Sequence, residues 1–240
     1  MMRIAMWSGP RNLSTAMMYS FGARDDCAVW DEPFYAAYLA QTGLDHPMRA
    51  EILAVGESDA ETVAARCLGR IPDGKTVFYQ KHMTHHMVPA IDREWMKHVT
   101  NIFLIRDPAK VIASYNAKRE NPTLDDIGLR QQAKLFDQVT KATGEVPVVV
   151  DSADILEDPE TLLRSICDHI GLLFQKNMLN WPKGGHKDDG AWADHWYRSV
   201  WESDGFSKPA ASTQTLSREG DTLYAEALPY YERLYKHRLN

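Results

Sequence analysis

Short apolar segments alternate with longer amphipathic segments along most of this chain. Largely apolar runs with the length of buried strands occur at residues 3–7, 27–30, 76–80, 101–105 and 146–150. Apolar residues recur at helical spacing within residues 13–21, 46–71, 124–142, 158–172 and 221–237. This alternation predicts an α/β fold in which helices flank a mostly parallel central sheet of about four or five strands.

The composition sets limits on domain organisation and partners. The chain has 240 residues, of which 44% are hydrophobic, enough for one substantial core. We therefore expect residues 1–240 to form a single domain. The formal net charge of −6 disfavours nucleic-acid binding through bulk positive charge, so any anion site has to be local.

Cysteine usage and hydropathy predict a cytoplasmic protein. Cys27, Cys67 and Cys167 are far apart, form no CxxC motif and lack metal-ligand spacing, which favours free thiols in a reducing compartment. There is no secretory leader, and no apolar run approaches the roughly 18 residues of a membrane span. We expect no membrane, no nucleic acid and no bound metal.

The most informative segment is SGPRNLST, residues 8–15, which lies between the first predicted strand and the first predicted helix. The N–H groups and positive dipole end of a helix N-terminus favour an anion, and Arg11, Ser14 and Thr15 add a cation and two hydroxyl donors. Because GK[ST] does not follow Gly9 at Walker A spacing, a nucleoside triphosphate is not the favoured ligand. The alternative is that the segment serves only turn and capping chemistry.

Polar residues also accompany the second and third predicted strands. Glu32 follows the second strand, where it could act as a general base facing the same crevice as residues 8–15 or only help to cap the next helix. Lys81 and a histidine cluster, His82, His85 and His86, follow the third strand. A histidine of this cluster, such as His82, is a second candidate base, and Lys81 could neutralise a transferred anionic group. The alternative for the histidine is a capped turn, and the lack of an HExxH motif disfavours a metal site.

A second anion motif occurs in NIFLIRDPAKVIASY, residues 101–115, where a strand passes into a helix that starts near Pro108. Arg106 lies at the strand end and Ser114 lies nearly two turns into the helix, so both could reach one anion. The alternatives are a salt-bridged Arg106–Asp107 turn and a serine without special function. Further along, the Gly-rich loop around Lys183 suits a lid over an anionic nucleotide.

Two of these segments together resemble the sulfotransferases that use 3′-phosphoadenosine 5′-phosphosulfate (PAPS). SGPRNLST is similar to the family's 5′-phosphosulfate loop, with Arg11 where lysine is frequent. The segment IRDPAKVIASY is similar to the family's 3′-phosphate motif and keeps its arginine-to-serine spacing at Arg106 and Ser114. The resemblance implies a P-loop-like fold and PAPS as the donor of the sulfuryl group.

Three further segments resemble family elements less completely. WDEPF, residues 30–34, resembles a Glu-Pro element of bacterial branches in which glutamate can be the base. QKHM, residues 80–83, partly resembles the lysine-threonine-histidine element of cytosolic members. KGGHKDDGAW, residues 183–192, is weakly similar to a later Gly-rich cofactor loop, which implies contacts from Lys183 and Gly184.

The resemblance also implies roles for single residues. Arg106 and Ser114 are implied to bind the 3′-phosphate. The 5′ end of the cofactor is implied to lie among the loop residues Gly9, Pro10, Arg11, Asn12, Ser14 and Thr15.

We therefore expect a cytoplasmic, PAPS-dependent sulfotransferase that acts on a hydroxyl or amine of a small-molecule acceptor. Glu32 or His82 is expected to be the base, with Glu32 favoured, while Arg11 and Lys81 stabilise charge on the leaving phosphate. One rival hypothesis is a P-loop kinase or nucleotide hydrolase, which predicts magnesium-dependent ATP or GTP binding. The other is a catalytically silent nucleotide-binding module.

Overall fold

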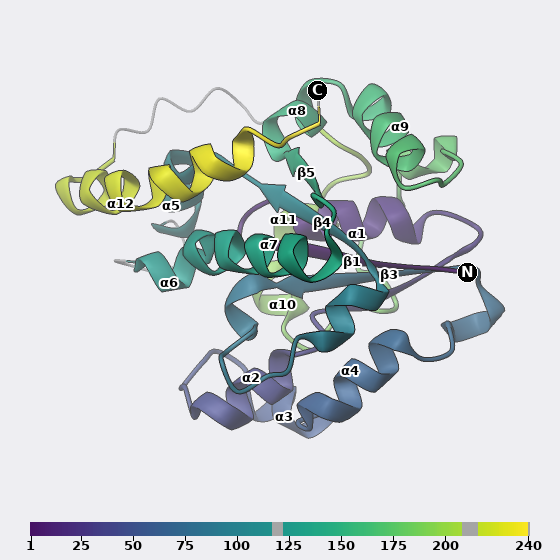
Figure 1. Cartoon of the computed structure of the whole chain (residues 1–240), viewed down its shortest axis with the longest axis horizontal. Helices are drawn as coiled ribbons and strands as arrows, with labels where there is room; N and C mark the ends of the chain where they lie inside the picture. Colours follow the sequence, from purple (N-terminus) through teal and green to yellow (C-terminus); the bar gives the residue numbers. More distant parts are fainter. Residues whose placement is uncertain (117–121, 208–215, 240) are drawn as a thin grey trace.

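The five predicted strands pair into one parallel sheet with the strand order β2-β3-β1-β4-β5. The computed structural model describes residues 1–116, 122–207 and 216–239 (Figure 1). Its strands are β1 (Met2–Ser8), β2 (Cys27–Asp31), β3 (Val77–Met83), β4 (Thr100–Ile105) and β5 (Val148–Asp151). This sheet confirms the predicted α/β fold. Apolar strands that are buried on both faces pair in parallel when helices form the crossovers between them.

Helices connect the strands and flank the sheet. They are α1 (Ser14–Gly22), α2 (Tyr35–Thr42), α3 (Arg49–Val55), α4 (Ala60–Leu68), α5 (Pro108–Asn116), α6 (Leu124–Ile127), α7 (Leu129–Thr143), α8 (Ser152–Glu157), α9 (Pro159–His169), α10 (Ala193–Trp196), α11 (Arg198–Trp201) and α12 (Arg218–Tyr235). Within the described ranges, no helix has both the length and the apolarity that crossing a membrane requires.

The sheet separates two apolar layers (Figure 1). On one face, α1 and α9 pack against strand residues such as Ile4 and Met6. On the other face, α4, α7 and α12 pack against the intervening residues, such as Ala5 and Trp7. The two-residue period of a strand therefore decides which layer receives each side chain.

Two predicted helices are each divided in the structure. The segment 46–71 contains α3 and α4, because Asp59 caps a new helix by accepting a hydrogen bond from the Thr62 N–H at 2.9 Å. The segment 124–142 contains α6 and α7, because Gly128 between them adopts a left-handed conformation with a φ of 73°.

All five strands end at the same edge of the sheet, since all of them are parallel. Strand β1 lies in the middle, between β3 and β4, and the chain crosses from it to both sides. Such a switch point at the carboxyl edge is where open α/β sheets bind ligands. The loop after β1, Glu32 after β2 and Arg106 after β4 all lie at this edge.

Candidate active site

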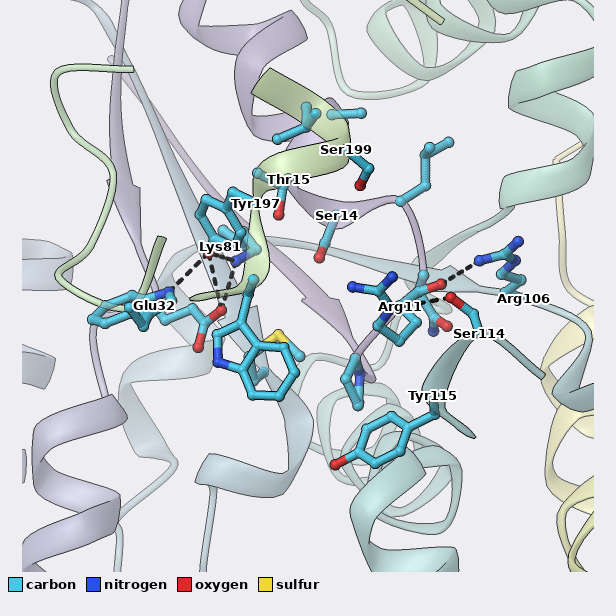
Figure 2. Close-up of a pocket in the computed structure, with 18 of the residues that line it drawn as sticks. Arg11, Ser14, Thr15, Glu32, Lys81, Arg106, Ser114, Tyr115, Tyr197 and Ser199 are labelled. Atoms are coloured by element: carbon cyan, nitrogen blue, oxygen red, sulfur yellow. Dashed lines mark hydrogen bonds and ion pairs between the residues drawn. The ribbon is translucent and has the colours of Figure 1, made fainter. Parts of the chain in front are cut away.

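A cavity of about 290 Å³ lies at this edge of the sheet. Its walls come from the loop and first turn of α1, from the ends of β2 and β3, from α5 and from the segment 192–207. Figure 2 shows Arg11 and Arg106 on one side, which we call the arginine end, and Glu32 and Lys81 on the other, which we call the glutamate end. The hydroxyl groups of Ser14 and Thr15 lie between the two ends.

The loop between β1 and α1 leaves the helix N-terminus open to the cavity. Arg11 and Leu13 adopt left-handed backbone conformations, with φ angles of 62° and 73°. Leu13 is the N-cap residue of α1, and its own apolar side chain makes no capping hydrogen bond. The first-turn N–H groups and the helix dipole are therefore available to an anion beside Ser14 and Thr15.

Gly9 and Asn12 hold this loop against the rest of the molecule. A Cβ atom on Gly9 would lie 2.2 Å from the Ile127 carbonyl oxygen, so only glycine permits this close approach. The Asn12 Nδ2 donates a hydrogen bond to the Leu104 carbonyl oxygen at 3.3 Å. Asn12 and Pro10 line the cavity, whereas Gly9 shapes the loop from outside it.

The structure brings Arg11, Arg106 and Ser114 together at the arginine end (Figure 2). The Arg11 Nε donates to Ser114 Oγ at 3.1 Å, and Arg106 Nη1 donates to the Arg11 carbonyl oxygen at 2.6 Å. Burial lowers the pKa of both guanidinium groups, and the charge of Arg11 lowers that of Arg106 further. Neither arginine forms a carboxylate ion pair within the described residues, so this end of the cavity attracts an anion.

Asp107 lies just before α5 and caps this helix instead of forming an ion pair with Arg106. Its Oδ1 accepts a hydrogen bond from the Ala109 N–H at 2.8 Å, and Pro108 is the first residue of the helix. The structure therefore shows a helix cap where an Arg106–Asp107 ion pair was the alternative. Arg106 is left to face the loop after β1.

Lys81 binds two carboxylates and a phenol at the glutamate end. Its Nζ lies 2.8 Å from Asp31 Oδ1, 2.6 Å from Glu32 Oε1 and 2.5 Å from Tyr197 Oη. All four side chains are buried. Although burial by itself favours the neutral amine, the two carboxylates hold the pKa of Lys81 above its usual value. Lys81 therefore stays charged, and the cluster has one carboxylate in excess.

Glu32 is held in a strained position that faces the cavity. Its φ of 41° is uncommon for a residue other than glycine. Burial raises the pKa of Glu32 despite the opposing charge of Lys81, and the Asp31 carboxylate raises it further. The N-cap of α2 is Phe34, without a side-chain cap, so Glu32 does not have the capping role considered from the sequence. Glu32 thus takes up a proton more readily than an exposed glutamate.

The sequence did not reveal Tyr197 as a site residue. Its hydroxyl lies 3.0 and 2.8 Å from the two carboxylate oxygens of Asp31 and accepts a hydrogen bond from Trp192 Nε1 at 2.9 Å. The Gly190 N–H donates to Asp31 Oδ2 at 3.1 Å, so Asp31 fixes this late segment over the glutamate end. The many aromatic residues between 192 and 201 predict buried contacts, but they do not predict that Tyr197 contacts Asp31.

The structure places His82 outside the cavity. Strand β3 continues to Met83, beyond its predicted end, so Lys81 and His82 point to opposite faces of the sheet. The ring of His82 stacks on Trp7 with centroids 4.5 Å apart, and burial lowers its pKa to about 3. His82 therefore lies in the core on the far side of β3 from the site where a base was expected.

Lys183 and Gly184 also lie outside the cavity. Lys183 is exposed, with Nζ 3.7 Å from Asp204 Oδ2. The Gly184 N–H donates to the Trp201 carbonyl oxygen at 2.8 Å. Neither residue lines the cavity in this arrangement, in which the loop is bound to the end of α11.

Comparison with known proteins defines the class of protein. The family model of the sulfotransferase domain matches residues 2–238, so the chain belongs to the sulfotransferase domain family. Two relatives from Arabidopsis thaliana, branched-chain-amino-acid aminotransferase-like proteins 1 and 2, are each 36% identical over 234 residues. The match covers 98% of this chain but 42% and 41% of theirs, so the chain spans about two-fifths of their length.

Solved structures share the fold. The sulfotransferase from Alicyclobacillus acidocaldarius has a TM-score of 0.62 at 11% identity, covering 100% of this chain and 97% of its own. The sulfotransferase domain from the curacin biosynthetic pathway has a TM-score of 0.55 at 16% identity, covering 95% of this chain and 98% of its own. The resemblance to sulfotransferases is thus confirmed by the family match, and these structures show that the fold is shared.

Proposed function

We propose that this protein transfers a sulfuryl group from PAPS to a hydroxyl or amine of a small-molecule acceptor. The observation that carries the proposal is the two-ended cavity, with paired arginines at one end, a carboxylate of raised pKa at the other and an uncapped helix N-terminus between them. An anionic donor suits the first end, and a hydroxyl or amine that must lose a proton suits the second.

The residues of the arginine end fit the phosphate groups of PAPS. Arg106 and Ser114 would hold the 3′-phosphate, supported by the absence of a carboxylate partner for Arg106 among the described residues. The 5′ end would lie against the N–H groups of α1, to which the Leu13 side chain makes no capping hydrogen bond. Its other contacts would come from Pro10, Arg11, Asn12, Ser14 and Thr15, which line the cavity. When bound, PAPS supplies the sulfuryl group.

Glu32 would act as the base at the other end of the cavity. The acceptor oxygen or nitrogen would bond to sulfur as the bond from sulfur to the phosphate oxygen breaks, and the acceptor proton would pass to Glu32. Arg11 and the first-turn N–H groups of α1 would stabilise the negative charge that develops on the leaving phosphate. Because this positive charge is built into the chain, we propose that transfer needs no metal ion.

Lys81 would order the base. Its Nζ binds Oε1 of Glu32 at 2.6 Å and shares Asp31 with Tyr197. These contacts fix the Glu32 carboxylate in one orientation, and the positive charge of Lys81 offsets the free-energy cost of burying a carboxylate. Lys81 is therefore proposed as a positioning residue beside the reacting groups.

We also propose that residues 1–240 form one domain and that the protein works in the cytoplasm. One sheet with two helical layers supports the first proposal. Three buried free thiols, Cys27, Cys67 and Cys167, are compatible with a reducing compartment.

Calorimetry with adenosine 3′,5′-bisphosphate, the desulfated cofactor, tests the proposal. We expect the bisphosphate to bind without magnesium. The R106A variant should bind it about 10- to 100-fold more weakly, because a charge-assisted contact to the 3′-phosphate is lost, while binding of adenosine 5′-monophosphate should change little. The matched control is R164A, since Arg164 is exposed on α9 and pairs only with Glu160 in the described ion pairs.

Three outcomes would overturn parts of the proposal. Equal weakening of both nucleotides in R106A would refute the 3′-phosphate role. Failure to bind the bisphosphate, together with magnesium-dependent ATP binding, would favour a kinase or nucleotide hydrolase. Tight binding without release of bisphosphate from PAPS, across a broad panel of hydroxyl and amine acceptors, would favour a catalytically silent module.

A further inference from the structure

Aromatic rings wall the glutamate end of the cavity. The ring of His86 stacks on Tyr35 and Tyr38, with centroids 4.5 and 4.8 Å apart. Trp192 meets Tyr35 edge to face at 4.9 Å. Tyr35, His86 and Trp192 all line the cavity. Flat apolar walls of this kind favour a ligand with a planar ring, because aromatic groups gain stability from stacked and edge contacts.

The charges of the cavity disfavour an anionic acceptor at this end. Among the described residues, Arg11 and Arg106 lie on the opposite side from Glu32 (Figure 2). Lys81 is already bound by two carboxylates. Burial lowers the pKa of His86 well below its usual value, so its ring is uncharged near neutral pH. A carboxylate or phosphate on the acceptor would therefore lie near the excess negative charge of the Asp31, Glu32 and Lys81 cluster, which repels it.

Glu32 and His86 present a matched pair of polar atoms to the cavity. The hydrogen bonds from Lys81 and Tyr197 both end on Glu32 Oε1, at 2.6 and 3.2 Å. The other oxygen, Oε2, lies 3.9 Å from His86 Nε2, which is too far for a direct hydrogen bond. A hydroxyl oxygen that lies beside the pair can be about 2.8 Å from each atom. His86 is 2% exposed, and its Nδ1 has no hydrogen-bond partner among the described residues.

We propose that the glutamate end binds an aromatic alcohol that carries no anionic group, with its hydroxyl oxygen in reach of both Glu32 Oε2 and His86 Nε2. The hydroxyl donates toward Glu32, and the Nε2–H of neutral His86 donates to a lone pair of the same oxygen. The aromatic walls bind the ring of the alcohol. This inference rests on the proposed function and deepens it by naming the acceptor class and the residue that orients the acceptor.

Acceptor binding is measured by calorimetry on the whole chain, with and without saturating adenosine 3′,5′-bisphosphate, so the measurement does not depend on turnover. The probes are 4-methylbenzyl alcohol and 4-(hydroxymethyl)benzoate, which differ mainly in charge. We expect the neutral alcohol to bind at least about tenfold more tightly than the benzoate, because a buried carboxylate without a partner is strongly disfavoured.

Equal or tighter binding of the benzoate, or no binding of the neutral alcohol, overturns the inference. The failure of the proposed function would look different. If the benzoate accepts sulfuryl groups as well as the neutral alcohol does, the acceptor class is wrong and the transferase proposal stands. If the bisphosphate does not bind, the transferase proposal fails whatever the alcohol does.

The H86F variant tests the orienting residue. Phenylalanine keeps a ring for the stack with Tyr35 and Tyr38 but removes both ring nitrogens. We expect KM for 4-methylbenzyl alcohol to rise about tenfold with a smaller change in kcat, because a hydrogen bond made to the bound hydroxyl is lost. The Kd of the bisphosphate should not change. The matched control is H82F, a histidine in a buried stack outside the cavity, which should keep its KM. An unchanged KM in H86F would show that the His86 ring only packs against its neighbours and does not orient the acceptor.

Discussion

Replacing Lys81 with methionine would leave two buried carboxylates without their cation. The side chains of Lys81 and Asp31 are each 1% exposed, and that of Glu32 is 9% exposed. Removing one partner of a buried ion pair destabilises a protein by about 3–5 kcal/mol, because the remaining charge is uncompensated. We expect K81M to lose about this much free energy of unfolding near pH 8. The loss should shrink as the pH falls, because each carboxylate that takes up a proton removes one uncompensated buried charge.

Urea denaturation of wild type and K81M at about pH 5 and pH 8 measures both effects. The matched control is K187M, since Lys187 makes only surface ion pairs with Asp73 and Asp188 in the described structure, and it should show no measurable change. The double variant E32Q/K81M should be more stable than K81M at pH 8. Wild-type stability for K81M at pH 8, or no gain in the double variant, would refute this account of the cluster.

The raised pKa of Glu32 predicts that kcat rises with pH through a pKa above the usual glutamate value of about 4.3, because the deprotonated base is the active form. E32Q should abolish this limb of the pH–rate profile and lower kcat by about 10²- to 10⁴-fold. An unchanged profile in E32Q would show that Glu32 is not the base. His82 predicts an effect on stability instead: its pKa is lowered to about 3 by burial, so the unfolded chain binds a proton below about pH 6.5 that the folded chain does not. Between about pH 6 and pH 4, wild type should therefore lose about 1.4 kcal/mol per pH unit more than H82F, and parallel urea-derived stability curves would contradict a neutral buried His82.

The sheet and the anion loop could be predicted from the sequence because their signals are local. A buried parallel strand is a short apolar run, and a helix N-terminus after such a run is marked within a few residues. The motif at Arg106 and Ser114 was found in the same way, since both residues belong to one strand-to-helix passage. The structure places them beside Arg11, because the carboxyl ends of β1 and β4 are neighbours.

The glutamate end could not be assembled from the sequence. Successive side chains of a strand point to opposite faces of the sheet, so Lys81 and His82 cannot both face the cavity while β3 continues through them. The sequence did not show that β3 extends this far. Lys81 meets Asp31 because the two residues are paired in the register of β2 and β3. Tyr197 reaches them from a segment that no local pattern connects with either strand.

The sequence by itself therefore determined the α/β class, the open helix N-terminus after β1 and the arginine motif after β4, because each depends on neighbouring residues along the chain. Only the tertiary structure decided the surroundings of Glu32. In the folded chain His82 lies in the core and Lys183 lies at the surface, whereas Tyr197 and His86 lie at the cavity. The physical reason is that strand register, strand length and the packing of a distant segment are set by the burial of the whole core, and no short stretch of sequence contains that information.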